Sequence, residues 1–491
     1  MNFWDEQPAF LIGISFLIGI GVALFSLPLW AAGLWLVYVV VLRRWTAIPI
    51  VFVAGAYAWL LHGSAPMLES SVACTARFSI HTIQTHQSPF HQSCAYKGIL
   101  YFDGHRLPCS VSASPSSRPA ADCDYLLKGT LQQRGPFDYV FKAKEWTPVK
   151  GTWSLAELRF QTKERLKVWL SQRLHRPRTA SLLFSLSSGE IEERLLRYEF
   201  GRLGLQHILA ISGFHFGVLV SAISACLGIF LPIRWKWLGM LVLASAYFLF
   251  IGAAPAVQRA WIAVALYLIA KLLRRPVHPV NLLGGALLIE LIANPLVAAN
   301  LGFQLSFGSC LGILLLHPWF EEQLCRVLPK RRAIANMQFK LGVQLIAVMT
   351  SFFRAALSLT LAVNAAILPL LLLHFGKFPL LGLLYNLFYP LLVSIALMGL
   401  MGALAVSFIA DPLSTPLFAI LDWWTEQLLH LVAYPPLVLD RSVYFKGIPL
   451  EAVIVYLFGG LLLAVHGRER REKLLGVEAE SLGAVKSERP R

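Results

Sequence analysis

The chain has 491 residues, of which 57% are hydrophobic and 14% are charged. Soluble domains carry about 25% charged residues, so the composition excludes a soluble protein and predicts a polytopic α-helical membrane protein. The formal net charge of +16 is typical either of a nucleic-acid-binding protein or of the Lys/Arg excess of cytoplasmic loops, and loop positions explain most of it.

Three apolar runs open the chain, at residues 9–27, 29–42 and 46–62. The first has neither a basic start nor a small-residue cleavage site, so residues 1–62 are expected to remain as transmembrane helices. Arg43 and Arg44 place the loop between the second and third runs in the cytoplasm, because cytoplasmic loops are enriched in Lys and Arg. The N-terminus is then expected inside, and residues 63–154 outside the membrane.

Residues 63–154 contain short β-prone pieces, such as 77–83, 95–102, 125–131 and 139–146, separated by Gly, Pro, Ser and Asp. Their spacing predicts a small barrel of about five strands, for which an OB-like fold is one solution. Such barrels bind single-stranded nucleic acid by stacking bases on aromatic rings beside Lys and Arg. The alternative is that many of these rings fill the barrel core. The candidates for DNA binding are Tyr96, Lys97, Tyr101, Phe102, Arg106, Lys128, Arg134, Phe137, Tyr139, Phe141 and Lys142.

Four of the seven cysteines lie in the same segment, namely Cys74, Cys94, Cys109 and Cys123. An oxidising compartment would allow disulfides with three full pairings, and at least one disulfide is expected. A metal site is not expected, because no C-x-x-C motif or His/Cys cluster occurs.

Residues 155–206 follow as an amphipathic helix and a linker. Within 155–174, leucines and Trp169 alternate with basic residues that include Arg159 and Lys163. Such a helix can lie on the membrane surface, which is the preferred interpretation, or collect phosphate groups near a pore entrance.

Apolar runs then resume at 205–231, 237–253, 257–272, 280–294, 300–316, 341–358, 361–375, 380–409 and 450–466. Simple alternation places the basic loops near 234–236, 271–275 and 326–332, and the tail 467–491, in the cytoplasm. About twelve spans with both termini inside are therefore predicted, with residues 207–410 as the central membrane domain and 411–466 as amphipathic and transmembrane helices. Several runs are short, so re-entrant pieces would change the count.

The segment 207–217 places two histidines, a serine and two glycines inside a hydrophobic stretch. If it is one helix, His207, Ser212 and His215 share a face that can line a path. Gly213 and Gly217 then lie on the opposite side, with the spacing that allows close helix packing.

Ionisable residues are rare between residues 203 and 316, where Glu290 is the only acid. Arg259 is expected at a similar depth and could pair with it, which would lower the cost of both charges. Gln304 and Ser306 add polarity to the run at 300–316, and Arg354 does so in its own run. A structural role in helix association is the alternative for each of them.

The segment 207–217 resembles the signature helix of the ComEC competence-protein family, the inner-membrane DNA channels of natural transformation. Four further blocks follow in order, at 255–260, 294–295, 301–307 and 368–376 with the adjoining 383–386. The arrangement of N-terminal spans followed by a small β domain is also similar to the family. The resemblance implies uptake of single-stranded DNA from periplasm to cytoplasm, with His207, Ser212, His215, Arg259, Gln304 and Ser306 at signature positions; Glu290 is not one.

The resemblance also implies partners, namely a periplasmic DNA receptor and membrane lipids. The chain has no G-x-x-x-x-G-K-[ST] phosphate loop, so a separate cytoplasmic ATPase or helicase is expected to supply the driving force. Many family members continue into a metallo-β-lactamase-like domain. This sequence contains no H-x-H-x-D-H cluster, so no nuclease or other enzymatic activity and no cofactor is expected.

Two other functions remain open. Residues 210–213 differ by one residue from the G-x-S-G motif of rhomboid-like intramembrane proteases, in which Ser212 would be a nucleophile and would need a base. Replacing Ser212 by Ala would abolish a protease and leave a channel largely active. A transporter of a small anionic solute would also use polar groups at the membrane midplane, but the β domain would then lack a purpose.

Overall fold

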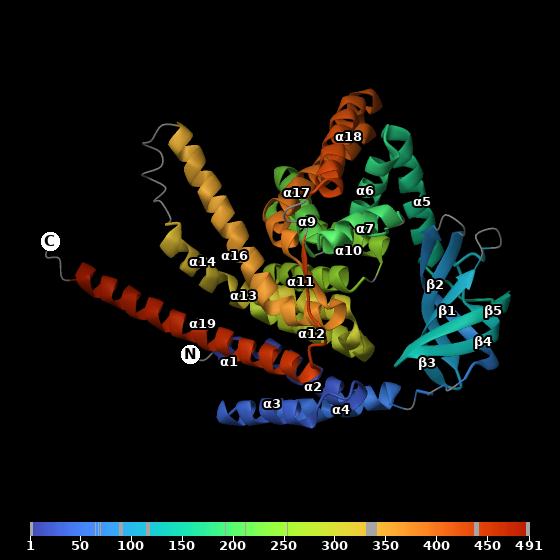
Figure 1. Ribbon diagram of the computed structural model, residues 1–491, viewed down its shortest axis with the longest axis horizontal. Coiled ribbons are helices and arrows are strands. Elements are labelled where there is room, and N and C mark those ends of the chain that lie inside the picture. The colour runs from blue at the N-terminus through green and yellow to red at the C-terminus, as the bar shows by residue number, and fades with distance from the viewer. Residues whose placement is uncertain are drawn as a thin grey trace.

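A computed structural model describes the chain except for residues 1–2, 64, 67, 69, 88–91, 114–117, 192, 212, 253, 330–340, 437–440 and 488–491. A helical body occupies most of the molecule, and a β-barrel lies at one end of it (Figure 1). Helix α1 (Phe3–Glu6) lies on the side of the helical body away from the barrel, and the C-terminal part of α19 (Leu450–Ser487) extends beyond it (Figure 1). The barrel and the two ends of the chain are therefore far apart.

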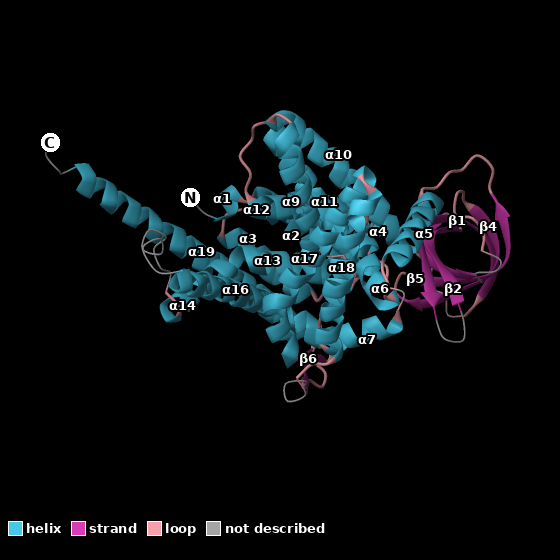
Figure 2. Cartoon of the chain, turned by 90° about the horizontal axis from the view of Figure 1, so that it is seen from above, coloured by secondary structure: helices cyan, strands magenta, loops and turns pink. Residues whose placement is uncertain are grey.

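The barrel consists of β1 (Val72–Gln87), β2 (Gln92–Phe102), β3 (His105–Ala113), β4 (Tyr125–Gly135) and β5 (Asp138–Pro148). It is closed in the order β1-β2-β3-β5-β4, and only the β3–β5 pair is parallel. This is the five-stranded arrangement of the OB fold, and Figure 2 shows the strands as a ring beside α5. The predicted small five-stranded barrel is confirmed, although β3 was not among the strands that the sequence pattern singles out.

Alternating side chains fill the barrel, because successive residues of a strand point to opposite faces. Phe78, Leu100, Val111, Leu127 and Phe141 are at most 1% exposed. At the β1–β2 contact the chains approach so closely that a Cβ at position 98 would lie 1.9 Å from the Ser79 carbonyl oxygen. Only glycine fits there.

An arm of three helices joins the barrel to the helical body: α5 (Ala156–Arg173), α6 (Pro177–Ser188) and α7 (Arg194–Arg202). Their apolar side chains share a core with α17 (Leu380–Ile409) and α18 (Asp411–Ala433), in which Leu182, Phe200, Tyr389 and Val432 are buried. The helix predicted at 155–174 corresponds to α5. It packs against protein, however, since the Trp169 ring meets the Phe418 ring edge-on at 5.3 Å.

The helical body is built from elements that follow the apolar runs. They are α1 (Phe3–Glu6), α2 (Pro8–Leu24), α3 (Leu29–Val41), α4 (Ala47–His62), α8 (Gln206–Leu209), α9 (Gly213–Phe230), α10 (Ile233–Ile251), α11 (Pro255–Leu272), α12 (Pro279–Ala293), η2 (Pro295–Ala299), α13 (Leu301–Leu315), α14 (His317–Val327), α16 (Leu341–Phe375), α17 (Leu380–Ile409), α18 (Asp411–Ala433) and α19 (Leu450–Ser487). Proline stands at the first position of α2, α11 and α12, where its missing N–H costs no hydrogen bond.

Among the described residues, six helices are long and apolar enough to cross a membrane, or seven if the bent pair α13–α14 forms one span. Helices α2, α3, α4 and α12 are apolar but shorter. The predicted runs 341–358 and 361–375 form one helix, α16, of 35 residues. The helix continues through Ser358 at the end of the first run, and the Ser358 hydroxyl donates to the His317 carbonyl (3.2 Å).

A two-stranded ribbon closes the α17–α18 hairpin. β6 (Lys377–Pro379), just before α17, pairs with β7 (Ser442–Tyr444), which follows α18. At the other end of the hairpin, Arg173 of α5 forms an ion pair with Asp411 (2.5 Å). Helices α17 and α18 are thereby fixed to each other and to the arm.

Candidate nucleic-acid interface and membrane path

The predicted helix over residues 207–217 is broken. Helix α8 ends at Leu209, Ala210 is extended (φ −73°, ψ 131°), and α9 begins at Gly213. Ile211 lies between the two helices and is buried with Phe216 and Val257, so tertiary packing overrides the helical pattern. The prediction of one face shared by His207, Ser212 and His215 is therefore wrong.

The two histidines have different surroundings. His207 is exposed and its Nδ1 lies 3.2 Å from the Gly204 carbonyl oxygen. His215, in the first turn of α9, is only 3% exposed. They lie close enough for an electrostatic interaction between their imidazoles. Ser212, the proposed protease nucleophile or path residue, lies outside the described residues.

Gly213 and Gly217 also differ. A Cβ at position 213 would lie 2.5 Å from Nη2 of Arg259, so this glycine makes room for the guanidinium of α11. A Cβ at position 217 would meet no atom within 4 Å. Gly213 therefore lies against side chains of α11 and not against a helix backbone, and the predicted close packing is wrong for Gly217, which faces an open space.

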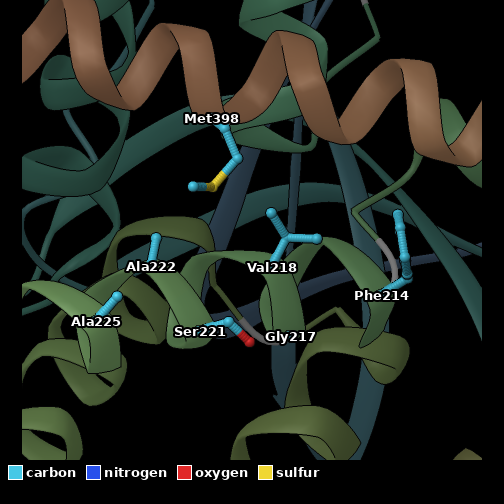
Figure 3. A pocket seen from close by; sticks show the side chains of 7 residues that line it. All are labelled: Phe214, Gly217, Val218, Ser221, Ala222, Ala225 and Met398. Carbon is cyan, nitrogen blue, oxygen red and sulfur yellow. The ribbon is translucent and has the colours of Figure 1, made fainter. Parts of the chain in front are cut away.

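That space is a groove of about 480 Å³ between α9 and α17. Figure 3 shows α9 side chains along one wall and Met398 of α17 opposite them. Ser221 is the polar side chain of the lining, which also includes Phe214, Gly217, Val218, Ala222 and Ala225. Phe214 is 48% exposed, so its ring is available to a ligand at the N-terminal end of α9.

Arg259 of α11 contacts Ser306 of α13, and both residues were predicted to line the path. Arg259 is 8% exposed, and its Nε donates to the Ser306 hydroxyl oxygen at 2.8 Å. Its guanidinium carbon lies 5.9 Å from the centre of the Phe307 ring, within range of a cation–π interaction. Gln304 instead has a local role, because its side-chain amide donates to the Ala298 carbonyl of the preceding turn (2.9 Å).

The expected Arg259–Glu290 ion pair is not formed. Glu290 is 1% exposed, and neither carboxylate oxygen has a hydrogen-bond partner among the described residues. Arg259 is near enough to act on Glu290 electrostatically, but its Nε donates to Ser306. A buried carboxylate without a partner is costly, so this charge is not explained by packing alone.

Arg354 has a structural environment. Its Nε forms an ion pair with Glu321 of α14 (3.1 Å), Nη1 donates to the Leu328 carbonyl (3.0 Å) and Nη2 donates to the Ser351 hydroxyl (3.3 Å). Nε and Nη1 join α16 to α14 and to Leu328 just after it, while Nη2 binds within α16. The sequence missed this because Glu321 lies 33 residues away on a helix that was not predicted.

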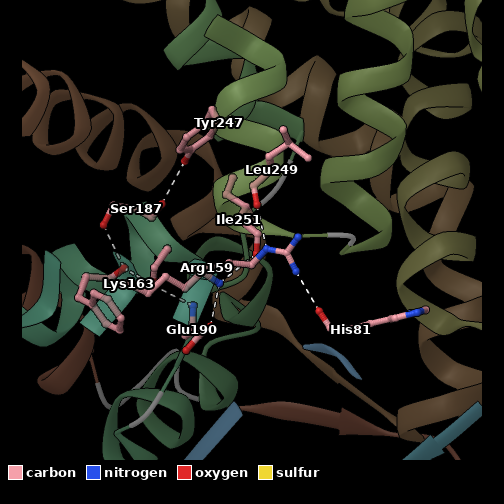
Figure 4. A network of polar contacts seen from close by, with 10 residues as sticks. His81, Arg159, Lys163, Ser187, Glu190, Tyr247, Leu249 and Ile251 are labelled. Carbon is pink, nitrogen blue, oxygen red and sulfur yellow. Dashed lines mark hydrogen bonds and ion pairs between the residues drawn. The ribbon is translucent and has the colours of Figure 1, made fainter. Parts of the chain in front are cut away.

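A polar junction connects the barrel, the arm and the C-terminal end of α10 (Figure 4). Arg159 donates to the carbonyl oxygens of His81 in β1 (2.9 Å) and Leu249 in α10 (2.8 Å). Lys163 forms an ion pair with Glu190 (2.7 Å) and donates to the Ile251 carbonyl (2.9 Å). Cations are favourable at a helix C-terminus, where carbonyl groups lack partners.

The contacts of this junction differ from the prediction that the basic residues of α5 face the membrane surface or collect phosphate groups. Lys163 is 5% exposed, and burial lowers its pKa while Glu190 opposes the shift. These two cations therefore cap α10 rather than offering themselves to phosphate groups in solution.

An exposed aromatic–basic platform lies on the outer face of the barrel. Tyr101 is 39% exposed, and the guanidinium carbons of Arg77 and Arg106 each lie 5.8 Å from its ring centre. The register explains this, because Tyr101 stands directly opposite Arg77 on β1 and Arg106 on β3. Arg77 was not predicted; Asp124 accepts a hydrogen bond from its Nε (2.9 Å).

The other predicted barrel residues divide by location. Lys97, Arg134 and Lys142 are exposed, and Lys128 is exposed but paired with Glu145 (3.1 Å). The predictions of Tyr96, Tyr139 and Phe141 as DNA-binding residues are wrong, since all three are at most 1% exposed in the barrel core, and Phe102 also packs against this core. Phe137, at a turn, contacts the rings of Phe25 and His62 and so attaches the barrel to the N-terminal helices.

The expected disulfide is absent, because Cys74, Cys94, Cys109 and Cys123 are not disulfide-bonded in the described structure. No two of the three strand cysteines are cross-strand partners: they stand opposite Gly129, Ala113 and Gly98. Burial raises the pKa of the Cys109 thiol to about 12. In the part of the chain that the structure describes, no three His, Cys, Asp or Glu side chains gather as metal ligands.

Comparison with known proteins gives two matches. A family model described as "Competence protein" matches residues 187–470. ComE operon protein 3 of Bacillus subtilis (strain 168) is 29% identical over 151 residues, which are 30% of this chain and 19% of that protein. The similarity thus spans about a fifth of the relative's length. No solved structure matches the chain.

Proposed function

We propose that this chain, which belongs to the competence protein family, carries one strand of DNA across the bacterial inner membrane from periplasm to cytoplasm. The observation that carries this proposal is the Arg77–Tyr101–Arg106 platform on an OB-type barrel. An exposed ring between two guanidinium groups can stack a base while the cations hold the flanking phosphates. Arg106 is fully available, while Arg77 shares its charge with Asp124.

The arrangement of the molecule supports a barrel in the periplasm and both termini in the cytoplasm. The barrel lies at one end, and α1 and the end of α19 lie at the other (Figure 1). The polar junction then marks the outer membrane surface, and the N-terminal ends of α9 and α11 lie just below it. The strand would pass from the platform to this region and along the groove beside α9.

The proposed partners are a periplasmic receptor that delivers DNA and a cytoplasmic ATPase or helicase that pulls the strand. Lipids surround the helical body. We further propose that the chain is a channel and not an enzyme, so purified protein should not cleave DNA with or without added divalent metal.

The test is DNA uptake in a strain of the source bacterium that lacks this gene. Fluorescently labelled DNA should enter the cytoplasm when the wild-type gene is restored, and Tyr101→Ala should reduce binding of oligothymidylate to the purified protein about 10-fold, the value of one stacked base. Tyr96→Phe is the control, because Tyr96 is buried in the same barrel. Normal uptake without the gene, or unchanged binding by Tyr101→Ala, would contradict the proposal.

The same strain distinguishes the small-solute alternative. A transporter of a small anion would show solute uptake that depends on the gene, and its loss would leave transformation intact. That outcome would replace DNA by a small anion as the substrate.

A further inference from the structure

The two buried arginines of the helical body, Arg259 and Arg354, are used differently. Arg354 is 3% exposed and all three of its nitrogen groups have protein partners. Arg259 is 8% exposed, but only Nε is bound, to Ser306. Among the described residues neither terminal amino group of Arg259 has a hydrogen-bond partner. The N–H donors of buried guanidinium groups are normally hydrogen-bonded. The two terminal amino groups of Arg259 therefore lack the acceptors that such a buried group normally has.

These donors lie against the start of a helix. Nη2 of Arg259 lies 2.5 Å from the position that a Cβ of Gly213, the first residue of α9, would occupy. The first four N–H groups of a helix have no acceptor within it and carry a partial positive charge. The 18-residue helix α9 therefore points its positive end at a second positive group.

The neighbourhood lacks a compensating contact. Glu290, the only acid between residues 203 and 316, is not within ion-pair distance of Arg259. Its carboxylate is buried without a hydrogen bond. Two positive groups lie at membrane depth with no anion in contact, and this arrangement strongly favours the binding of an anion.

We propose that the N-terminus of α9 and the terminal amino groups of Arg259 bind a phosphate group. Given the proposed function, this phosphate belongs to the backbone of the DNA strand in transit. Helix N–H groups and a guanidinium are both suited to phosphate oxygens. Gly213 is required because any side chain there would fill the space that the guanidinium occupies.

The experiment uses the full-length protein in detergent, with a photo-crosslinking p-benzoylphenylalanine at position 214, which is exposed beside Gly213. The probe is a 30-nucleotide oligothymidylate. Arg259→Gln should weaken crosslinking about 10-fold and reduce the salt dependence of binding by about 0.7, the contribution of one phosphate on a single strand.

Arg354→Gln is the matched control, which should lower the thermal midpoint without changing crosslinking. Because Arg259→Gln could disturb folding, Gly213→Ala provides a second variant that keeps the arginine but displaces it, and it should also lose crosslinking. Unchanged crosslinking in a folded Arg259→Gln or Gly213→Ala protein would overturn the proposal.

Two further arms separate the source of the phosphate and the two proposals. In phosphatidylglycerol nanodiscs, crosslinking to lipid with exclusion of the oligothymidylate would identify a lipid site and overturn the assignment to DNA. Inorganic phosphate, at matched ionic strength, should raise the thermal midpoint of the wild type but not of Arg259→Gln. If the gene proved dispensable for DNA uptake while this dependence on Arg259 remained, the proposed function would fail and the anion site would stand.

Discussion

The carboxylate of Glu157 fixes the arm to the barrel, and removing its charge should loosen this attachment. Glu157 is 8% exposed and accepts two hydrogen bonds from Arg118 (2.7 and 2.9 Å), one from the Ala121 N–H (2.9 Å) and one from Gln161 (2.9 Å). Burial raises the pKa of Glu157, but these hydrogen bonds and the Arg118 charge outweigh it and lower the pKa to about 2.

The size of the effect follows from this pKa. The ordinary value is 4.5 and the folded value is about 2, so at 1.36 kcal/mol per pKa unit the charge stabilises the fold by about 3 kcal/mol at neutral pH. Because the folded pKa is depressed, this contribution is present above pH 4.5 and is lost as the pH falls toward 2. The Glu157→Gln variant lacks this stabilisation at every pH, because the glutamine side chain carries no charge.

Hydrogen–deuterium exchange of the full-length protein, followed in peptides covering residues 118–125 and 154–161, measures the effect. At pH 7, Glu157→Gln should exchange about 100-fold faster there than the wild type, and the difference should shrink below pH 4. Glu145→Gln is the control, because the exposed Lys128–Glu145 pair should contribute little. Equal exchange of Glu157→Gln and wild type at pH 7 would refute the reasoning.

Three further predictions concern the junction and the barrel. Lys163→Met leaves Glu190, whose side chain is 15% exposed, without its ion-pair partner and should cost about 3 kcal/mol, seen as a lower thermal midpoint; adding Glu190→Leu should recover part of the loss, and no recovery would contradict the pairing. Gly98→Ala should disrupt barrel exchange protection because its Cβ would overlap the Ser79 carbonyl, whereas Gly135→Ala, with no atom within 4 Å of its Cβ, should not. Cys109, whose pKa is raised to about 12 by burial, should resist maleimide at pH 8 in folded protein, and rapid labelling would contradict its environment.

The barrel could be predicted from the sequence, but the residues on its outer face could not. Along β2, Tyr96 and Tyr101 lie on opposite faces because their numbers differ by an odd count. Both neighbouring residues 99 and 100 are apolar, Ile and Leu, so the pattern does not reveal which face is the core. Arg77 joins Tyr101 only through the register of two strands, which depends on tertiary pairing.

The structure of the membrane domain could likewise be predicted only in part from the sequence. The apolar runs locate most helices, and Asn294–Pro295 correctly marks a break before α13. The break after Leu209 was missed because the burial of Ile211 causes it, and helical periodicity does not report burial. The contact between Gly213 and Arg259 joins residues on different helices, so it also required the structure.

In addition to the arm, two contacts hold the barrel to the helical body: Arg159 joins His81 to Leu249 of α10, and Phe137 lies against Phe25 and His62. Two attachments restrict the movement of the barrel relative to the helical body. The distance between the outer platform and the proposed inner phosphate site therefore stays constant. The two sites together therefore respond to the length of a bound strand. A strand long enough to reach both gains from effective concentration, whereas a shorter strand binds only one. Affinity should therefore rise in a step as oligothymidylate is lengthened, and the length at the step would give the separation in nucleotides.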